Sequence, residues 1–341
     1  MDFDLTEEQR EIRRVARELL AARSPMSKVR EAAEAGAYDG ALWSEIVELG
    51  WPGIAVRERH GGQGLGFVEL AVLAEELGYA CAAAPFLSTA VAAATIDACG
   101  SDAQRERWLP ALTAGTAGTA GTAVAAVGLR ELAIDGEGAA VAIVIDGSDA
   151  SLMQSPDTEL VATIDPTRRF AALSAGAPGD ARDPGEPLGA GAAARFRAAL
   201  AAEVVGVCQR ALEMTLTYVK ERRQFGVAVG SFQAVSHRCA EMLLHTESAR
   251  SAAYYAAWAA DSSPEQLEEA SALAAAAAAT AAREVAASAI QAHGGIGFTW
   301  EADVHWLYKR GEVDRALLGA PGRHHVALAR AVAARLPAAA G

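Results

Sequence analysis

The sequence has few cysteines and no surplus of positive charge. Its four cysteines are Cys81, Cys99, Cys208 and Cys239. No two of them have the Cys-x-x-Cys spacing of a zinc ribbon. We expect buried thiols rather than a secreted disulfide scaffold. His237 and His293 lack a second ligand at metal-binding spacing, so no metal site is predicted. Acidic residues outnumber basic ones by 43 to 30, a net charge of -13, so no nucleic-acid partner held by a basic face is expected.

The sequence also lacks a visible signal peptide and a strongly apolar run of membrane-spanning length. It begins with charged and polar residues at 1–10. A membrane helix needs about 20 strongly apolar residues. The most apolar stretch, 271–282, is mostly alanine and runs into Arg283 and Glu284. Because alanine favours helix formation more than membrane insertion, we expect a cytoplasmic protein without a membrane span.

What is present is the composition of a globular protein. Hydrophobic residues make up 52% of the chain and charged residues 21%, which argues against disorder. The 341 residues suffice for two or three domains at about 100–200 residues each. Neither length nor composition indicates a function.

Residues 1–118 are predicted to form an all-α N-terminal domain. Thr6 and Gln9 have the spacing of a capping box, and apolar residues then recur at helical intervals. A further helix is predicted at 67–78, ending at its glycine. The glycine-rich loop at 60–66 follows no apolar strand, so it does not indicate a dinucleotide-binding GxGxxG motif.

Residues 119–190 are predicted to form a reduced middle β domain and a linker. Two hairpin-type turn signals flank a run rich in β-branched residues. The turns are Asp135-Gly136 and Asp146-Gly147, and the run is 139–145. The low-complexity run within 114–123 is predicted to be a loop, and the Gly-, Ala- and Pro-rich stretch at 174–194 a linker.

Residues 191–341 are predicted to form a C-terminal helical bundle. Apolar residues between 200 and 218 recur every three or four positions. Ser263-Pro264 with Gln266 has the pattern of an N-cap, an N1 proline and a capping box. The helix that follows is predicted to end at His293-Gly294.

Several longer motifs occur in a fixed order along the chain. The C-terminal ones are Arg222-x-x-Phe225-Gly226, Ser231-Phe232-Gln233 and Gln291-x-x-Gly294-Gly295-Ile296-Gly297. The N-terminal ones lie at 42–50, 60–64 and 75–78. Together they resemble the acyl-CoA dehydrogenase family over nearly the whole chain. The segment 165–169, Asp-Pro-Thr-Arg-Arg, resembles one that is common in actinobacterial members.

The resemblance implies a mainly α fold with a small β domain between an N-terminal helical domain and a C-terminal helical bundle. It also implies a flavoprotein of lipid metabolism that binds FAD without a covalent bond. Such an oxidoreductase removes the α proton and the β hydride of an acyl-CoA thioester and gives a trans-2-enoyl-CoA. Electron-transfer flavoprotein or a similar acceptor is the implied redox partner.

The resemblance assigns FAD contacts to the first C-terminal motif. Arg222 takes the place of an arginine that reaches the FAD diphosphate of a neighbouring subunit, and a guanidinium pairs bidentately with phosphate oxygens. The alternative is that Arg222 complements the carboxyl end of a helix dipole. Phe225 and Gln233 would flank the adenosine half.

A second diphosphate contact is implied at Gln291, Gly294 and Gly295. Glycines let backbone amides approach phosphates closely. The alternative is an ordinary glycine C-cap. Glu301 and Arg310 also match the family pattern and are interpreted as structural ion partners.

The usual catalytic glutamate of the family is missing. By the resemblance it falls at Gly319 or at Phe196, and neither is a carboxylate. The catalytic base is therefore unknown at this point. The nearest acidic residues are Glu203, Glu312 and Asp314. The region 123–138 also lacks the Thr-Glu-Pro-x-x-Gly-Ser loop that faces the flavin in the family.

These absences favour a subunit of a hetero-oligomeric enzyme, because some members of the family consist of two homologous subunits with FAD at their interface. The partner would then supply the base. One alternative is a self-sufficient dehydrogenase with a relocated base, for which Glu203 is a candidate about two turns from Phe196. Another is a non-catalytic scaffold that keeps only the fold, and a flavin monooxygenase or a nitroalkane-oxidase-like enzyme shares that fold too. The 165–169 segment suggests an acyl-CoA substrate with a steroid side chain or a branched or aryl acyl group.

Overall fold

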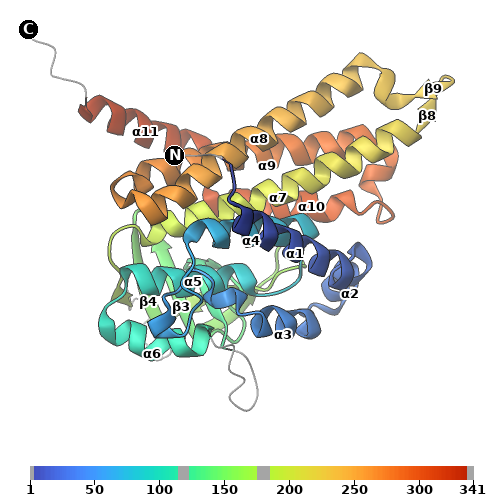
Figure 1. Cartoon of the computed structure of the whole chain (residues 1–341). Coiled ribbons are helices and arrows are strands. Elements are labelled where there is room, and N and C mark those ends of the chain that lie inside the picture. The colour runs from blue at the N-terminus through green and yellow to red at the C-terminus, as the bar shows by residue number, and fades with distance from the viewer. Residues whose placement is uncertain (1–3, 114–122, 175–184, 336–341) are drawn as a thin grey trace, which may run out of the picture.

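Helices build both ends of the chain, and a β sheet lies between them in sequence (Figure 1). The computed structural model describes residues 4–113, 123–174 and 185–335. The predicted fold class, mainly α with one small β region, is confirmed. The predicted loop lies outside these residues except at its last position, and so does the part of the predicted linker at 175–184.

Within residues 4–113, the N-terminal region consists of six α-helices and two short 3-10 helices. They are α1 (Glu7–Arg23), α2 (Met26–Ala35), α3 (Gly40–Glu48), η1 (Trp51–Gly53), η2 (Glu58–His60), α4 (Phe67–Ala80), α5 (Phe86–Cys99) and α6 (Asp102–Thr113). The capping box predicted at the start of α1 is present. The Thr6 side chain accepts from the Gln9 amide, and the Gln9 side chain accepts from the Thr6 amide.

The middle region forms a mixed sheet with the strand order β5-β6-β2-β1-β3-β4-β7. Its strands are β1 (Ala125–Leu129), β2 (Leu132–Ile134), β3 (Val141–Asp146), β4 (Asp149–Gln154), β5 (Asp157–Val161), β6 (Phe170–Ser174) and β7 (Glu186–Pro187). β1 and β3 pair in parallel, and the other neighbours pair antiparallel. Hence the described part of the predicted linker includes one short edge strand.

One of the two predicted hairpin turns is present. β3 and β4 pair with Asp146 opposite Asp149, as a hairpin at Gly147 requires. The hairpin predicted at Asp135-Gly136 is wrong, because β2 pairs with β1 and β6 instead of β3. Asp135 has a positive φ of 58°, and its buried carboxylate accepts hydrogen bonds from Tyr38 and Ser88. Asp135 therefore connects the sheet to the N-terminal helices instead of forming a hairpin turn.

The C-terminal region is a bundle of long helices that forms the upper layer in Figure 1. Its elements are α7 (Ala192–Glu221), β8 (Arg223–Gln224), β9 (Val227–Ala228), η3 (Val229–Ser231), α8 (Gln233–Ser262), η4 (Pro264–Gln266), α9 (Leu267–His293), η5 (Gly294–Phe298), α10 (Val304–Leu318) and α11 (Pro321–Arg335). Among the described residues, one helical stretch, Pro264–Phe298, is long and apolar enough to cross a membrane by length and composition. Its apolar window is 61% buried inside the protein, as in a core helix of the bundle.

Two further sequence predictions need correction. α9 ends at His293 as predicted, but Ser263 makes no capping hydrogen bond. The Gln266 side chain instead accepts from Tyr255, 2.8 Å away, so the expected capping box does not form. Of the cysteines, Cys99 is only half-buried, whereas the other three are buried.

Close packing between α4 and α7 explains why α4 continues past its predicted end at Gly78. A Cβ at Gly78 would overlap the backbone of Glu203, and a Cβ at Gly206 would overlap the carbonyl oxygen of Glu75. Both glycines therefore let the two helix backbones approach each other, at the usual entropic cost of glycine inside a helix. Gly78 is a packing residue, and the helix ends only at Ala80.

Candidate functional site

The predicted FAD residues of the first motif lie where α7 ends and α8 begins. Arg222 is the C-cap of α7, with an extended backbone, and its amide donates to the Tyr218 carbonyl at 2.8 Å. Its side chain is exposed and forms no hydrogen bond or ion pair with any residue that the structure describes. A guanidinium in this state can take two phosphate oxygens, although a cation here also complements the helix dipole.

The short β8–β9 hairpin after Arg222 presents aromatic surface to solvent. Phe225 is 92% exposed and has a positive φ of 52°. Its ring meets that of Phe232 edge-on, at a centroid distance of 6.2 Å. Gln233, the first residue of α8, is exposed beside this pair in sequence. Because Phe225 stays almost fully exposed in spite of this contact, the hairpin is suited to contact another molecule.

The second predicted motif lies at the end of α9. Gly294 has a φ of 64°, and a Cβ at Gly294 or Gly295 would meet no atom within 4 Å. A Cβ at Gly297, in contrast, would lie 2.6 Å from the Ile290 carbonyl oxygen. Gly297 is thus needed for packing, whereas the open space at Gly294 and Gly295 lets another group reach the backbone. Gln291 is exposed one turn earlier.

A ring stack joins the two motifs at one end of the bundle. Tyr218, one turn before Arg222, stacks on His293 at a centroid distance of 4.5 Å. His293 is buried, and its Nδ1 lies 2.8 Å from the Ala289 carbonyl oxygen. We call the exposed surface of 222–233 and 291–300 the bundle tip. Figure 1 shows the β8–β9 part of it at the upper right, far from the sheet.

The positions of the missing catalytic glutamate are occupied by residues that cannot act as a base. Phe196 is buried in α7, with an exposed fraction of 3%. Gly319 is the C-cap of α10, with a φ of 85° that disfavours other residues. The imidazole of His324 lies next to it, with Nε2 2.7 Å from the Leu318 carbonyl oxygen. Burial lowers the pKa of His324.

The acidic residues nearest to these positions are already paired. Glu203 is 1% exposed and accepts from Arg168 and Arg310. Asp314 is fully buried and accepts from Arg168 at 3.0 Å. Glu312 pairs with Arg315 within its own helix. Glu203 therefore has the ion-paired role, which argues against its use as a relocated base.

The charges around Glu203 form a buried cluster that the sequence alone did not indicate. It consists of Asp165, Thr167, Arg168, Glu203, Arg310 and Asp314. Arg310 donates to Asp165 at 2.7 Å, to Glu203 at 2.8 Å and to Thr167. We call this set the buried ion cluster. It fastens the loop before β6 to α7 and α10, so the family-like 165–169 segment has a structural role.

In the buried ion cluster three carboxyl groups face two guanidinium groups, so the cluster would carry a net negative charge if all three were ionised. Burial, and next the charge of Glu203, hold the pKa of Asp314 well above its usual range. Oδ2 of Asp314 has no hydrogen-bond partner among the residues described. The prediction of a structural ion partner is thus confirmed for Arg310. It is wrong for Glu301, which is exposed and forms no ion pair with the described residues.

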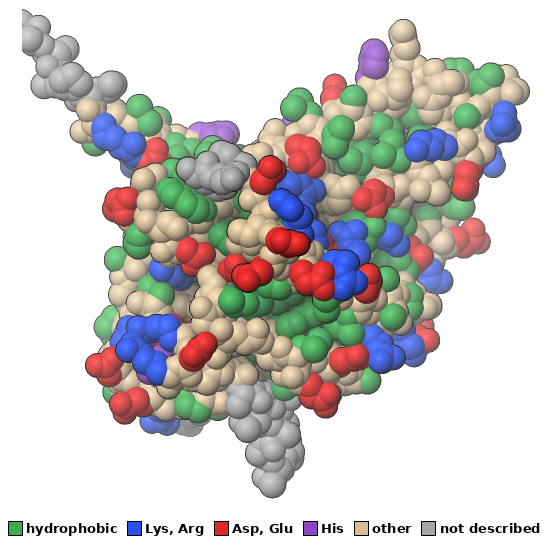
Figure 2. All heavy atoms as spheres, viewed as in Figure 1, with side chains coloured by type: hydrophobic (Ala, Val, Ile, Leu, Met, Phe, Trp, Pro, Cys, Tyr) green, Lys and Arg blue, Asp and Glu red, His purple; other side chains and the backbone are tan. Residues whose placement is uncertain are grey.

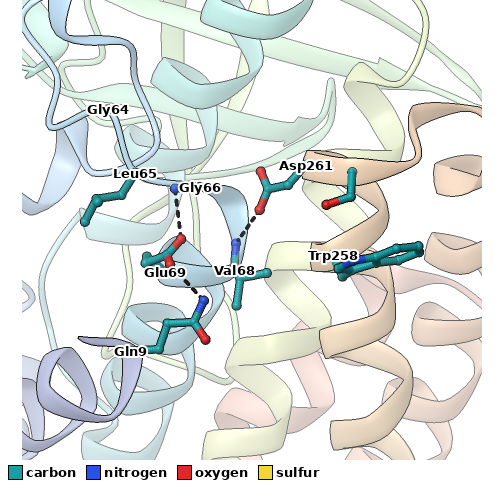
Figure 3. Close-up of a pocket in the computed structure, with 9 residues that line it drawn as sticks. Gln9, Gly64, Leu65, Gly66, Val68, Glu69, Trp258 and Asp261 are labelled. Carbon is teal, nitrogen blue, oxygen red and sulfur yellow. Dashed lines mark hydrogen bonds between the residues drawn. The ribbon is translucent and has the colours of Figure 1, made fainter. Parts of the chain in front are cut away.

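A shallow hollow of about 420 Å³ lies between the glycine-rich loop and the end of α8 (Figure 3). Its polar groups serve helix α4. The Asp261 carboxylate accepts from the amides of Phe67 at 2.7 Å and Val68 at 3.1 Å. Glu69 accepts from the Gly66 amide and from the Gln9 side chain. These bonds account for the hollow as a capping arrangement.

The glycine-rich loop itself is held by backbone hydrogen bonds. Amides of residues 63–65 donate to carbonyls of residues 53–56 at 2.8–3.1 Å. A Cβ at Gly62 would overlap the Val56 carbonyl. Because its amides are used within the loop, this segment is not a phosphate cradle, in agreement with the sequence prediction. The described residues also contain no cluster of three or more His, Cys, Asp or Glu side chains able to hold a metal ion.

Similarity to known proteins covers both helical regions and extends to the whole chain. Residues 6–116 match the family model for the N-terminal domain of acyl-CoA dehydrogenase, and residues 190–333 match that for its C-terminal domain. The acyl-CoA dehydrogenase IpdE2 of Mycobacterium tuberculosis is 33% identical over 324 residues, 92% of this chain and 94% of the relative.

Solved structures with this fold include the Tcur3481-Tcur3483 steroid ACAD G363A variant, with a TM-score of 0.84 and 26% identity over 96% of this chain and 98% of that one. The ChsE4-ChsE5 complex from Mycobacterium tuberculosis has a TM-score of 0.82 at 24% identity, over 99% of this chain and 100% of that one. Together with the two matched domains and the relative of nearly equal length, these likenesses show that the chain belongs to the acyl-CoA dehydrogenase family.

Proposed function

We propose that this chain is one subunit of an acyl-CoA dehydrogenase made of two homologous chains. In this proposal it binds the diphosphate and adenosine side of FAD, the cofactor of the family, and the partner holds the flavin ring. One contrast supports the proposal. The bundle tip offers an exposed, unpaired arginine, whereas no carboxylate stands at Gly319 or Phe196, and Glu203, Glu312 and Asp314 are ion-paired.

The residues of the bundle tip have the chemistry that a diphosphate needs. Arg222 would pair with phosphate oxygens, and the open backbone at Gly294 and Gly295 would approach them. Phe225 and Gln233 would flank the adenosine, one by ring contact and one by its amide. When bound, FAD supplies the acceptor for the β hydride of the acyl-CoA thioester.

The partner would supply the carboxylate that takes the α proton. In this chain a glutamate at position 319 would have to adopt a φ of 85° next to His324, and position 196 is closed by core packing. The contribution of this chain to catalysis is therefore to bind and orient the cofactor, with the proton transferred elsewhere.

The substrate that we propose is an acyl-CoA with a bulky group of the steroid side-chain, branched or aryl type. The name of the steroid ACAD at 26% identity supports this class. Electron-transfer flavoprotein or a similar acceptor would take the electrons. We also propose a cytoplasmic protein with domain boundaries at 118/119 and 190/191.

The experiment compares the chain expressed alone with the chain co-expressed with a homologous dehydrogenase chain from the same genome. We expect flavin absorbance and turnover of a steroid side-chain acyl-CoA only in the co-expressed complex. A yellow, fully active homo-oligomer of this chain alone would contradict the proposal. A colourless complex that ignores added FAD would instead favour the scaffold alternative, and thermal stabilisation by FAD measures this directly.

Arg222 and Arg223 form a matched pair for testing the cofactor role. Both are exposed neighbours at the end of α7, so Arg222→Met and Arg223→Met remove the same charge. We expect Arg222→Met to lose most of the bound FAD and Arg223→Met to keep it, because only the former removes the proposed phosphate fork. Equal FAD content in the two complexes would show that Arg222 merely complements the helix end.

A further inference from the structure

A cluster of rings around Lys309 has no part in the cofactor contacts proposed above. Nζ of Lys309 lies 4.2 Å from the ring centroid of Trp300 and 4.6 Å from that of Trp306. The His305 ring packs against both indoles, at centroid distances of 5.0 Å and 4.3 Å. We call these four residues the Lys309 cluster. Cation–π contact stabilises an ammonium in such a setting but neutralises no charge.

Several polar groups of the Lys309 cluster lack partners. Both ring nitrogens of His305 and Nε1 of Trp306 lack a hydrogen-bond partner among the described residues. Yet His305 is 9% exposed and Trp306 3%. The ammonium of Lys309 makes no hydrogen bond or salt bridge to a described residue, and burial lowers its pKa. Buried polar groups are nearly always satisfied. We therefore expect an acceptor from outside the described residues to complete the Lys309 cluster.

The segment 296–300, which ends at Trp300 of the Lys309 cluster, exposes large apolar side chains. Trp300 is 69% exposed, Phe298 80% and Ile296 38%. They follow directly after Gly294 and Gly295 in the bundle tip. Exposed aromatic side chains are enriched in protein–protein interfaces, and tryptophan is among the residues that contribute most to binding there. A small anion would pair with Lys309 but would leave this apolar area exposed.

We propose that the Lys309 cluster is a docking site for a carboxylate side chain of the homologous partner subunit. The carboxylate would pair with Lys309, while Trp300 and Phe298 pack against the partner's surface around it. This inference rests on the proposed two-chain enzyme and deepens it by naming the anchor. One feature favours a protein over a free ion: the exposed apolar side chains of 296–300, which a small ion would leave uncovered.

The test uses the flavin-loaded complex obtained by co-expression and measures the dissociation constant between its two chains at low and high salt. We expect Trp300→Ala to weaken association about 30-fold, as for a buried interface anchor. Lys309→Met keeps the length of the side chain. It should weaken association about tenfold and reduce its dependence on salt, because the ion pair is lost.

Matched controls exist elsewhere in the chain. Trp258 stacks on Tyr255 at the opposite end of α8, and Lys28 pairs with Glu31 on α2. Trp258→Ala and Lys28→Met should leave the dissociation constant unchanged. Thermal melting of each isolated variant shows whether it is folded before association is measured.

The outcomes separate the two proposals. A flavin-loaded wild-type complex whose dissociation constant is unaffected by both cluster variants overturns the docking site alone. Absence of any wild-type complex overturns both proposals. If AMP or inorganic diphosphate raises the melting temperature of the isolated chain, and Lys309→Met removes that effect, the cluster binds a nucleotide anion and the carboxylate assignment is wrong.

Discussion

Two regions of this molecule use arginine in opposite ways. At the bundle tip, Arg222 is exposed and has no carboxylate partner among the described residues. In the buried ion cluster, Arg168 and Arg310 are nearly inaccessible, at 5% and 1% exposure, and are paired with Glu203 and other acids. The difference lies in the carboxylates around each guanidinium. Where acids from other elements surround the arginine, it holds the fold together, and where none does, it can bind a ligand.

The surface of the molecule carries charges of both signs. Figure 2 shows Asp and Glu side chains interspersed with Lys and Arg over the face in view, without one continuous basic field. Hydrophobic side chains lie in several groups over the upper right arm, where α8 lies, and also at the centre of the view, below the charged side chains. Leu243 and Leu244 of α8 are 49% and 64% exposed. An exposed apolar surface on this arm is suited to contact another subunit.

The largest effect is expected for the buried ion cluster. Arg310→Met removes the donor for Asp165 and Glu203 and leaves both carboxylates buried. We expect the free energy of unfolding to fall by about 3–5 kcal/mol, because breaking a buried pair leaves an uncompensated charge. Urea denaturation measures it. Arg222→Met is the control and should change the free energy of unfolding by less than about 0.5 kcal/mol. Similar values for the two variants would remove the distinction between the regions.

How far the sequence could predict these regions depends on the distance over which their contacts act. The capping box at Thr6 and the turn at Gly147 are local, and the pattern predicted both. The residues of the bundle tip belong to motifs of a few consecutive residues, so the sequence alone could single them out. The buried ion cluster joins Asp165 to Arg310, 145 positions apart, and no local pattern reports such a contact. The turn signal at Asp135 failed for the same reason, since its partners are in the N-terminal helices.

Two glycines differ in the space around them, one between packed helices and one at the bundle tip. Gly206→Ala would place a methyl group into the Glu75 carbonyl, so α4 and α7 must separate. We expect a loss of about 3 kcal/mol in the free energy of unfolding, at the upper end of overpacking effects. Gly295→Ala meets open space and should alter stability by less than about 0.5 kcal/mol. It should still lower FAD content, because the added methyl group separates the backbone from a diphosphate.

The pH dependence of stability tests the excess of acid in the buried ion cluster. The pKa of Asp314 is raised in the folded protein by burial and by Glu203, whereas an unfolded aspartate titrates near about 3.9. The native state therefore holds a proton that the unfolded chain releases. Stability from this group is complete below about pH 3.9 and is lost as the pH rises through the folded pKa, by at most about 1.4 kcal/mol per pH unit.

Asp314→Asn isolates this contribution, since the amide oxygen still accepts from Arg168 and cannot titrate. We expect the stability of the variant relative to the wild type to increase between about pH 4 and pH 8. Urea denaturation at each pH gives the difference, in which other titrating groups cancel. A difference that is constant with pH would mean that Asp314 is ionised in the folded protein throughout this range.

The smallest expected effect concerns Phe225, which is 92% exposed. Phe225→Ser should leave the unfolding free energy of the isolated chain within about 0.5 kcal/mol of wild type, because little packing is lost. In the two-chain complex it should weaken FAD binding by about 1 kcal/mol, roughly fivefold, since a ring beside the adenosine is removed. Val227→Thr on the same hairpin is the control and should keep full affinity. If Phe225→Ser and Val227→Thr bind FAD equally well, the hairpin serves only subunit contact, and the adenosine must lie against another part of the assembly.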